Sequence, residues 1–447
     1  MSKILSTIGP ISSSNKAIKK ILKYCGFLRI NGSHNSIEWH VKISKRIKKL
    51  NKNSIVLFDI PGIKPRIKIS NEIIIHKKKK CCFYFGKKPK LNGINYYIEL
   101  TNPLPTNKIK SKSFSLSDGN FNFRLVLRSK NFIIGSSDQK FKLENKKGLN
   151  IPQSIYSDKL QNKRYLNFLK KTKKVKFDAI GLSFVQNSSI IKKIKKNFPK
   201  KIIVSKIENV EGLKNCSEII KESDLIMIDR GDLGAEIGEN ELYKSIIKIT
   251  SEAKREGKIV IMATENLQSM INGFSPNKNE LISLEFSLSQ HSDFIMLSEE
   301  TAISKRYYEI IKWLNGFLLK KDIKYSLKNE DFDFWKNIKI YDKSNVIIFT
   351  KKGYAIQKIR QANFFADLTV FTDNPKVHFL SNLRPKTKSF LTKKFKNTNL
   401  LNFVYKNIKF HKKQIFKKFN SALLIYVSFP RSGARANTMT LINKNDF

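Results

Sequence analysis

Two short apolar runs in the middle of the chain each lead into charged residues. Residues 202–208 read Ile-Ile-Val-Ser-Lys-Ile-Glu, and residues 225–232 read Leu-Ile-Met-Ile-Asp-Arg-Gly-Asp. Their length and β-branched content predict buried strands, with the charges gathered at the C-terminal ends. Packing gives no reason for Lys206, Glu208 and Asp232 at those ends. We therefore expect a site for a divalent cation and an anionic substrate.

The chemistry of these three side chains suits phosphoryl transfer. Glu208 and Asp232 are oxygen ligands on neighbouring predicted strands, and Mg²⁺ is held by one or two carboxylates together with substrate oxygens and water. Lys206 lies two positions before Glu208, so both side chains face the same side of a regular strand. An ammonium beside a metal can stabilise a phosphoryl group in transfer. Taken alone, Lys206 is better explained by a structural salt bridge with Glu208. Asp232 on the next predicted strand adds a second carboxylate and favours a site for a metal and a phosphoryl group.

Other residues could bind or protonate a substrate. Residues 230–235, Arg-Gly-Asp-Leu-Gly-Ala, predict a tight turn that opens a short helix, and the free N–H groups at such a start bind anions. Arg29 offers a planar fork for a phosphate, or it is a surface cation. Thr264 ends an apolar run and could donate or relay a proton, or it caps a helix.

Alternating strands and helices must position these residues. Eight apolar runs begin at Ile4, Phe27, Ile55, Ala179, Ile202, Leu225, Ile259 and Phe294. Amphipathic helices are predicted between most of them, for example over 37–50, 188–198, 242–256 and 279–291. This alternation predicts an α/β fold, a closed (β/α)8 TIM barrel whose active site lies at the C-terminal ends of the strands. Polar residues follow all eight runs, which packing does not explain: Thr7, Arg29 with Asn31 and Ser33, Asp59, Ser183, Lys206 with Glu208, Asp232, Thr264, and Ser298 with Glu300.

Two further domains are predicted. A β-rich stretch separates the third and fourth runs, with strand-like segments at 73–75, 82–85, 96–98 and 132–134. We expect an inserted small β-barrel that works as a lid at the barrel mouth. A separate α/β domain should follow, with strands at 345–349, 368–371 and 422–427 and a helix over 354–361. The predicted boundaries are 1–66 with 153–320 for the catalytic barrel, 67–152 for the lid and 330–447 for the C-terminal domain.

The composition narrows the class of protein. The formal net charge is +50, which predicts a weak, salt-sensitive affinity for polyanions. Lys, Asn and Ile are all abundant, as in proteins of AT-rich genomes, so we expect no specific nucleic-acid partner. The cysteines form no CxxC pair and should be reduced, as in a cytoplasmic protein: Cys25, Cys81, Cys82 and Cys216. No apolar run is long enough to span a membrane, and we expect no membrane partner.

The ordered set of motifs resembles the pyruvate kinase family across most of the chain. The most specific motifs are Lys206 to Asn209, Arg230 to Gly234, and Ala263-Thr264 through Ser269-Met270. Further motifs of the barrel, the lid and the C-terminal domain are also similar: Thr7 to Pro10, Arg29 to His34, Met296 to Ser298 with Glu300 to Ala302, Ser117 to Gly119, Lys147 to Pro152, Thr350 to Gly353, and Gly433 to Thr438.

The resemblance implies a glycolytic phosphotransferase that converts phosphoenolpyruvate and ADP into pyruvate and ATP. It implies Mg²⁺ or Mn²⁺ held by Glu208 and Asp232. It also implies three catalytic residues: Lys206 stabilises the phosphoryl group, Arg29 grips the phosphate, and Thr264 is tied to protonation of the enolate. The implied substrate-binding residues are Arg29, Lys206, Gly231, Asp232 and Thr264, and the implied nucleotide-binding residues are Asn31, His34, Arg66 and Lys147.

The family's monovalent-cation site is altered. Asn31, Ser33 and Asp59 match the family pattern, whereas Ile60 replaces a threonine and offers only its carbonyl for K⁺. A nearby acidic residue of many members is Lys64 here, and its ammonium could stand in for bound potassium. We therefore expect activity that does not depend on K⁺.

Other departures bear on efficiency and regulation. Asp229 replaces a small residue, Glu265 a glutamine and Glu299 a glycine, so negative charge is added near anionic substrates. In the C-terminal domain, Lys352 and Ala355 stand where serines are typical of the sugar-bisphosphate loop. Weak activation, or none, by a phosphorylated sugar is expected.

Four functions remain open at this point. The first is an active pyruvate kinase, and the second is a catalytically weakened pyruvate-kinase-like protein that binds ligand or partners. The third is a polyanion-binding protein built on the same barrel, and the fourth is another metal-dependent barrel enzyme acting on phosphoenolpyruvate or a keto acid. The resemblance further implies a homo-oligomer, either a tetramer or a dimer.

Overall fold

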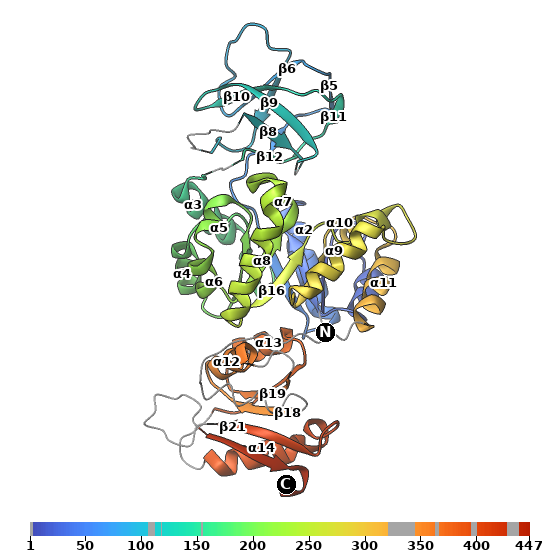
Figure 1. Cartoon of the computed structure of the whole chain (residues 1–447), viewed down its shortest axis with the longest axis vertical. Coiled ribbons are helices and arrows are strands. Elements are labelled where there is room, and N and C mark those ends of the chain that lie inside the picture. The colour runs from blue at the N-terminus through green and yellow to red at the C-terminus, as the bar shows by residue number, and fades with distance from the viewer. Residues whose placement is uncertain are drawn as a thin grey trace.

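The computed structural model describes residues 3–105, 112–117, 119–152, 155–320, 345–362, 366–394, 400–426 and 438–447. Its centre is a closed barrel with strand order β1-β17-β16-β15-β14-β13-β3-β2, in which neighbouring strands are parallel (Figure 1). The strands are β1 (Lys3–Thr7), β2 (Phe27–Asn31), β3 (Ile55–Ile60), β13 (Ala179–Leu182), β14 (Ile202–Ile207), β15 (Leu225–Asp229), β16 (Ile259–Ala263) and β17 (Phe294–Leu297). The predicted barrel is confirmed, and every strand after the first begins at the predicted residue.

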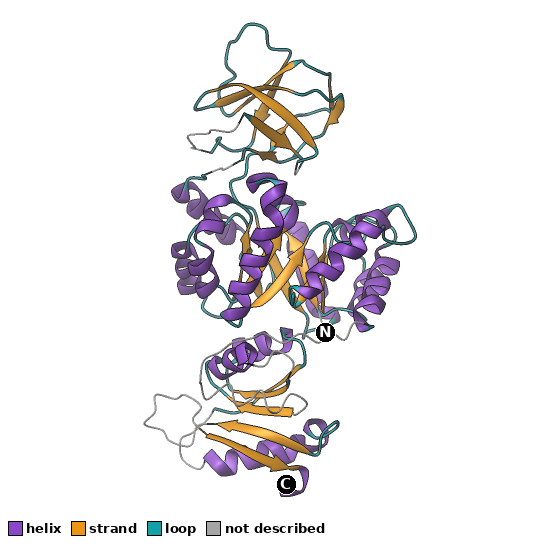
Figure 2. Cartoon of the chain, in the orientation of Figure 1, coloured by secondary structure: helices purple, strands orange, loops and turns teal. Residues whose placement is uncertain are grey.

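Helices cover the outside of the barrel (Figure 2). They are α1 (Asn15–Leu22), α2 (Ile37–Leu50), α3 (Asp158–Lys171), α4 (Ser188–Asn197), α5 (Val210–Lys214), α6 (Cys216–Glu222), α7 (Arg230–Ile237), α8 (Glu239–Arg255), α9 (Lys278–Ser289), α10 (Glu299–Ala302) and α11 (Tyr307–Leu319), with the 3-10 helix η1 (Gln268–Ile271). Asn277 and Glu280 form a capping box that fixes the start of α9. Helix α8 begins at Glu239 rather than at residue 242, directly after Gly238, whose φ of +92° ends α7.

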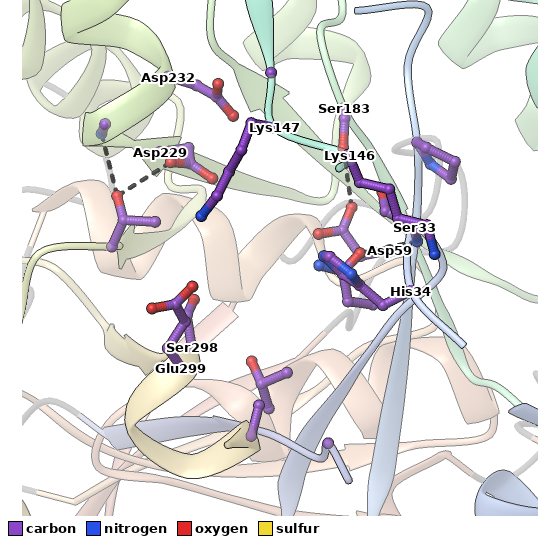
Figure 3. A pocket seen from close by; sticks show the side chains of 18 of the residues that line it. Ser33, His34, Asp59, Lys146, Lys147, Ser183, Asp229, Asp232, Ser298 and Glu299 are labelled. Atoms are coloured by element: carbon purple, nitrogen blue, oxygen red, sulfur yellow. Dashed lines mark hydrogen bonds between the residues drawn. The ribbon is translucent and has the colours of Figure 1, made fainter. Parts of the chain in front are cut away.

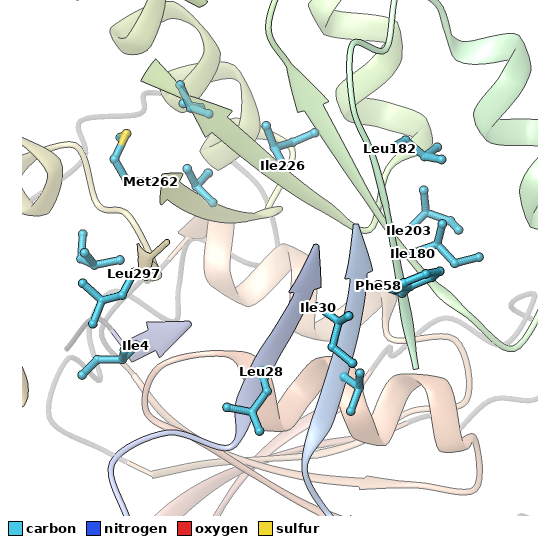
Figure 4. Close-up of a cluster of buried hydrophobic side chains, with 14 of the residues drawn as sticks. Ile4, Leu28, Ile30, Phe58, Ile180, Leu182, Ile203, Ile226, Met262 and Leu297 are labelled. Carbon is cyan, nitrogen blue, oxygen red and sulfur yellow. The ribbon is translucent and has the colours of Figure 1, made fainter. Parts of the chain in front are cut away.

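Alternate residues of the barrel strands pack into two different apolar layers. Ile203 and Ile226 belong to the outer layer, between barrel and helices (Figure 4). Val204 and Met227 belong to the inner layer, which fills the barrel. Because side chains of a strand alternate in direction, Lys206 follows Val204 onto the inner face. The same alternation brings a set of polar residues to the top of the barrel interior: Thr7, Arg29, Asp59, Ser183, Lys206 and Asp229.

The predicted insertion is a β domain at the C-terminal ends of the barrel strands (Figure 1). Its main sheet has the order β12-β8-β9-β10-β6-β7-β4, and β11 pairs with β5. Phe83, Phe114 and Phe123 form its aromatic core. The strands are β4 (Ile67–Lys68), β5 (Ile73–Ile75), β6 (Lys80–Tyr84), β7 (Tyr96–Leu100), β8 (Ser113–Leu116), β9 (Phe121–Arg128), β10 (Phe132–Ser136), β11 (Phe141–Leu143) and β12 (Leu149–Asn150).

The C-terminal α/β domain lies at the opposite end of the barrel (Figure 1). Its sheet has the order β20-β19-β18-β21-β22. Lys3 Nζ donates a hydrogen bond to the carbonyl of Asn382 at 2.8 Å, and Leu383 packs against the inner barrel core. The elements are β18 (Asn345–Phe349), α12 (Tyr354–Ala362), β19 (Asp367–Thr372), α13 (Pro375–Leu383), β20 (Thr387–Leu391), α14 (Leu400–Ile415), β21 (Ser421–Tyr426), β22 (Thr438–Asn443) and the 3-10 helix η3 (Lys444–Asp446).

Some of the sequence-based expectations remain open. Asp118 of the lid motif, Val427 of the last predicted strand, and residues 433–437 lie outside the described residues. The exact domain boundaries stay a prediction. All the cysteines are buried free thiols, as expected. Among the helices that the structure describes, none has both the length and the apolar character needed to cross a membrane.

Candidate active site

A cavity of about 790 Å³ opens where the barrel strands end, beneath the lid (Figure 3). Its walls combine barrel residues with residues 144–148 of the lid. The polar strand ends predicted from the sequence are brought together here. The lining includes Thr7, Arg29, Asn31, Ser33, His34, Asp59, Lys64, Arg66, Lys147, Ser183, Lys206, Gly231, Asp232, Thr264 and Ser298.

Lys206 lies at the centre of a buried cluster of charges. Its Nζ is 2.6 Å from Oε1 of Glu208, 3.2 Å from Oδ2 of Asp229 and 3.6 Å from Oδ2 of Asp59. It also donates to the hydroxyl of Ser183 at 3.4 Å. Burial alone would lower the pKa of Lys206, but the three carboxylates outweigh burial and raise this pKa well above its usual value. The ammonium is therefore charged at neutral pH.

Three carboxylates form one acidic cluster beside this ammonium. Ligand oxygens of Glu208, Asp229 and Asp232 all lie within 4.8 Å of one another. Burial raises the pKa of Glu208 to about 8, although Lys206 opposes the shift. Burial would also raise the pKa of Asp232, but the ammonium groups of Lys64 and Lys206 lower it to about 2. Carboxylate oxygens at this spacing fit a hard cation such as Mg²⁺ or Mn²⁺, whose charge favours the ionised form of Glu208.

The acidic cluster spans two kinds of element. Glu208 directly follows β14, whereas Asp232 lies in the first turn of α7 and not on a strand. The short helix predicted from residues 230–235 is confirmed as α7, but the tight turn expected to open it was wrong, because α7 begins at Arg230, immediately after β15. The Arg230 guanidinium fixes this start by donating to the backbone carbonyls of Thr264 and Glu265, the latter at 2.9 Å.

Thr264 follows β16 with a left-handed backbone, φ +60°. The single hydrogen of its hydroxyl can reach two acceptors, the Ala263 carbonyl at 2.7 Å and Oδ1 of Asp229 at 3.1 Å, and the hydroxyl accepts from the N–H of Gly231 at 3.2 Å. Figure 3 draws the bond that ends on Asp229 as a dashed line. Thr264 is no helix cap, since η1 begins only at Gln268. The Gly231 N–H was expected to bind an anion, and the Thr264 hydroxyl was expected to take part in proton transfer. The structure joins these two groups by a hydrogen bond.

Arg29 is buried rather than a surface cation. Its Nε and Nη2 donate to Oδ2 of Asp59 at 2.9 and 2.6 Å, and its Nη1 donates to the hydroxyl of Thr7 at 3.2 Å. Asp59 also accepts from the Ser183 hydroxyl at 3.2 Å (Figure 3). Burial would raise the pKa of Asp59, but Lys206 and Arg29 lower it. The guanidinium is thus held at a fixed position on the cavity wall.

Cationic side chains line the side of the cavity expected to face the nucleotide. His34 and Lys147 both project into the cavity in Figure 3. Lys147 pairs with Glu144 at 3.1 Å, and Arg66 donates to the carbonyl of Lys146 at 3.1 Å. Burial and the charge of Arg66 lower the pKa of His34 to about 4, so its imidazole is neutral at pH 7. These groups could bind phosphate oxygens through the two lysines and Arg66.

The residues of the candidate K⁺ site have other partners. Oδ1 of Asn31 accepts the N–H of Ser33 at 3.0 Å. Ile60 is fully buried, and its carbonyl accepts a backbone N–H from Ser183 at 3.3 Å. Lys64 is 3% exposed and forms an ion pair with Oδ1 of Asp232. The sequence did not reveal this partner of Lys64, which lies in the acidic cluster.

The three added acids all line the cavity. Glu299 begins α10 and is exposed, and Figure 3 shows it on the wall beside Ser298. Glu265 follows Thr264 and also has a positive φ, +51°. The negative charge of Asp229 is paired, because this carboxylate lies 3.2 Å from Nζ of Lys206 and 3.1 Å from the Thr264 hydroxyl.

Sequence analysis missed one buried acid close to the cavity. Glu236 of α7 is fully buried, and its Oε1 accepts from the hydroxyl of Tyr156 at 3.3 Å and from Nδ2 of Asn150 at 3.5 Å. Burial raises the pKa of Glu236 to about 8. Its position four residues after Asp232, on the same helix face, is the signal that could have found it.

Comparison with known proteins agrees with this geometry. The family model described as "Pyruvate kinase, barrel domain" matches residues 1–310. The chain belongs to the pyruvate kinase family. It is 34% identical over 325 residues to a pyruvate kinase of Methanocaldococcus jannaschii and 31% identical over 325 residues to one of Thermococcus litoralis, and each match covers 70% of this chain and 68% of the relative. A pyruvate kinase of Thermoplasma acidophilum is 28% identical over 395 residues, which cover 86% of this chain and 68% of the relative.

Proposed function

We propose that this protein transfers the phosphoryl group of phosphoenolpyruvate to ADP and so produces pyruvate and ATP in glycolysis. The bond between phosphorus and the enol oxygen breaks, and a β-phosphate oxygen of ADP forms the new bond to phosphorus. The enolate left behind takes up a proton at its terminal carbon. One observation carries the proposal: the buried ammonium of Lys206 lies beside Glu208, Asp229 and Asp232 in a cavity that barrel and lid share.

Lys206 supplies the fixed positive charge that phosphoryl transfer requires. The carboxylates around it hold the ammonium in place and keep it protonated. Such a preorganised charge stabilises the negative charge on the phosphoryl oxygens without reorganisation during the reaction. Arg29, fixed by Asp59 and Thr7, is proposed to grip the phosphate.

Glu208 and Asp232 are proposed to hold Mg²⁺ or Mn²⁺. When bound there, the metal supplies positive charge for the phosphoryl and carboxylate oxygens of the substrate. The N–H groups of Gly231 and Asp232, in the first turn of α7, would bind the substrate carboxylate, for which Gly231 exchanges its bond to the Thr264 hydroxyl for a substrate oxygen. The Thr264 hydroxyl, bonded to Gly231 and Asp229, is proposed to take part in proton delivery to the enolate.

The nucleotide is proposed to lie on the side of His34, Arg66 and Lys147, with Asn31 nearby. Lys147 belongs to the lid, so lid movement would couple nucleotide binding to closure. We further propose that Lys64 replaces K⁺ by placing its ammonium in the same cavity. The protein is proposed to act in the cytoplasm as a homo-oligomer, a tetramer or a dimer.

A coupled assay for pyruvate tests the proposal. Purified full-length protein is incubated with phosphoenolpyruvate, ADP and Mg²⁺, and Lys206→Met is measured beside it. Pyruvate formation that requires both substrates and is lost in the variant is the expected result. If the wild-type protein releases no pyruvate under any of these conditions, the proposal is refuted.

A second candidate is a catalytically weakened pyruvate-kinase-like protein that binds ligand or partners. One contact favours it: Asp229 lies 3.2 Å from Lys206 and reduces the positive charge available to a phosphoryl group. Isothermal titration with phosphoenolpyruvate in the presence of Mn²⁺ separates the candidates. Binding without turnover supports the second candidate, and binding with turnover supports the first.

A further inference from the structure

Asp229 has an unusual placement for the last residue of a strand that leads directly into a helix. It occupies the N-cap position of α7, where an Asp side chain commonly accepts an N–H of the first helical turn. The Asp229 carboxylate makes no such capping bond. It turns into the barrel instead and meets the Lys206 ammonium and the Thr264 hydroxyl. The helix start is fixed by Arg230, so the carboxylate is free for another role.

The strand register brings this carboxylate to the proposed metal ligands. Asp229 pairs with Ala263 on β16, whose small side chain is fully buried in the inner layer. On the other side, Lys206 of β14 lies opposite Met227 of β15, so Asp229 extends beyond Lys206 toward the cavity. Its ligand oxygen lies within 4.8 Å of those of Glu208 and Asp232. A carboxylate that accepts one hydrogen bond and one ion pair still has lone pairs to offer.

The charges of the site also call for a third carboxylate. Lys64 forms an ion pair with Asp232 and so compensates the charge of one of the two proposed ligands. The ammonium and guanidinium groups of Arg29, Lys64 and Lys206 form ion pairs with four carboxylates: Asp59, Glu208, Asp229 and Asp232. The charge of a bound metal favours the ionised form of Glu208, and with Glu208 ionised these four carboxylates face three cations. Removing Asp229 takes one negative charge from that set and weakens its attraction for a dication.

We propose that Asp229 is a third carboxylate ligand of the divalent cation, beside Glu208 and Asp232. This inference rests on the proposed metal site and adds to it a ligand at a position where the family pattern has a small residue. An octahedral ion with three protein carboxylates keeps fewer waters than one with two. The extra ligand restores the affinity that the pairing of Asp232 with Lys64 removes.

Mn²⁺ binding to the purified full-length protein, without substrates, tests this role. Electron paramagnetic resonance measures free Mn²⁺, and line broadening by ¹⁷O-labelled water counts the waters on the bound ion. The variants are Asp229→Ala, which removes charge and ligand, and Asp229→Asn, which removes the charge but keeps an oxygen. Glu299→Gln is the matched control, because it removes a carboxylate from the same cavity wall outside the cluster.

The ligand role predicts a graded result. Asp229→Ala should weaken Mn²⁺ binding by about tenfold or more and add about one water to the bound ion, as expected for loss of a charged ligand. The Mn²⁺ affinity of Asp229→Asn should lie between those of Asp229→Ala and wild type. The Mn²⁺ affinity of Glu299→Gln should stay within about twofold of wild type. Circular dichroism melting checks that each variant is folded.

Two other results would overturn the inference, and they differ from failure of the proposed function. If Asp229→Ala and Asp229→Asn weaken Mn²⁺ binding equally and the number of waters on the bound ion does not change, Asp229 acts only through its charge on Lys206. If binding is unchanged in both variants, Asp229 has no part in the metal site. Failure of wild-type protein to bind Mn²⁺ would instead contradict the metal site itself, and with it the proposed function.

Discussion

The buried carboxyl of Glu236 makes the stability of the barrel depend on pH. Glu236 is fully buried, and burial raises its pKa from 4.5 to about 8. Its Oε1 accepts from Tyr156 and Asn150, which flank the chain connection from the lid back to the barrel, while its Oε2 has no hydrogen-bond partner among the described residues. The folded protein therefore holds a proton on Glu236 at neutral pH that the unfolded chain has released.

The sign and the size of the effect follow from this difference. Between about pH 4.5 and about pH 8 the folded state binds one more proton than the unfolded state, so stability falls as pH rises through this window. At about 1.4 kcal/mol for each pH unit, the rise in pKa from 4.5 to about 8 corresponds to an upper limit of about 5 kcal/mol. Relaxation around the charge would reduce this figure, and we expect a loss on the order of 2 to 4 kcal/mol.

The Glu236→Gln variant isolates this contribution, because Gln keeps the shape and the acceptor oxygen without the ionisation. Urea unfolding followed by circular dichroism gives the midpoint for both proteins at several values between about pH 5 and about pH 8.5. The wild-type midpoint should fall relative to that of the variant as pH rises. Parallel curves for the two proteins would refute the reasoning, since they would mean that Glu236 has the same proton affinity folded and unfolded.

Three further outcomes are expected. Replacing Na⁺ by K⁺ at constant ionic strength should change the wild-type rate by less than about twofold. The rate of Lys64→Gln should instead be stimulated by K⁺, because this change removes the buried ammonium from the site. A several-fold stimulation of the wild-type rate by K⁺ would argue against the proposed replacement of K⁺ by Lys64. Glu299→Gly should raise kcat/KM for phosphoenolpyruvate by up to about tenfold, because it removes an anion from the wall of an anion-binding cavity. An unchanged kcat/KM would show that the Glu299 carboxylate does not reach the substrate. Phosphorylated sugars should shift half-saturation by phosphoenolpyruvate by less than about twofold, because Lys352 and Ala355 replace hydroxyl donors, and a large leftward shift would contradict that expectation.

The barrel could be predicted because its strands have a simple signature. Each is buried on both faces, one toward the helices and one toward the interior, so each appears in the sequence as an unbroken apolar run. The charged residues Arg29, Asp59, Lys206 and Asp229 lie where the barrel interior meets the cavity, whereas the polar Ser6 and Ser205 are buried within the runs. Lys206, Glu208 and Arg29 could be assigned to one site for that reason.

Other elements gave no such signature. Strand β9 leaves Val126 and Leu127 about half exposed and carries Arg at two positions, so its pattern is neither a buried run nor a clean alternation. Strands β8 and β11 and helices α13 and α14 were also not identified, since short or partly exposed segments lack a strong period.

The contacts within the site could not be predicted from the sequence either. Asp229 meets Lys206 and Thr264 only because β14, β15 and β16 are in a particular register. Lys64 reaches Asp232 across 168 positions of the chain, through the fold of barrel and lid connection. Sequence spacing shows which side chains lie near a strand end but does not show which carboxylate pairs with which cation.

The most direct test of the central claim is the turnover of Lys206→Met compared with wild type. A unit charge about 4 Å from a phosphoryl oxygen is worth about 4 kcal/mol at an intermediate dielectric, or about three powers of ten in rate. We predict that ³¹P NMR shows wild-type protein converting phosphoenolpyruvate and ADP into ATP, and that the variant does so about a thousandfold more slowly while still binding phosphoenolpyruvate. A variant that keeps more than about a tenth of the wild-type rate would contradict the claim that this buried ammonium carries the reaction.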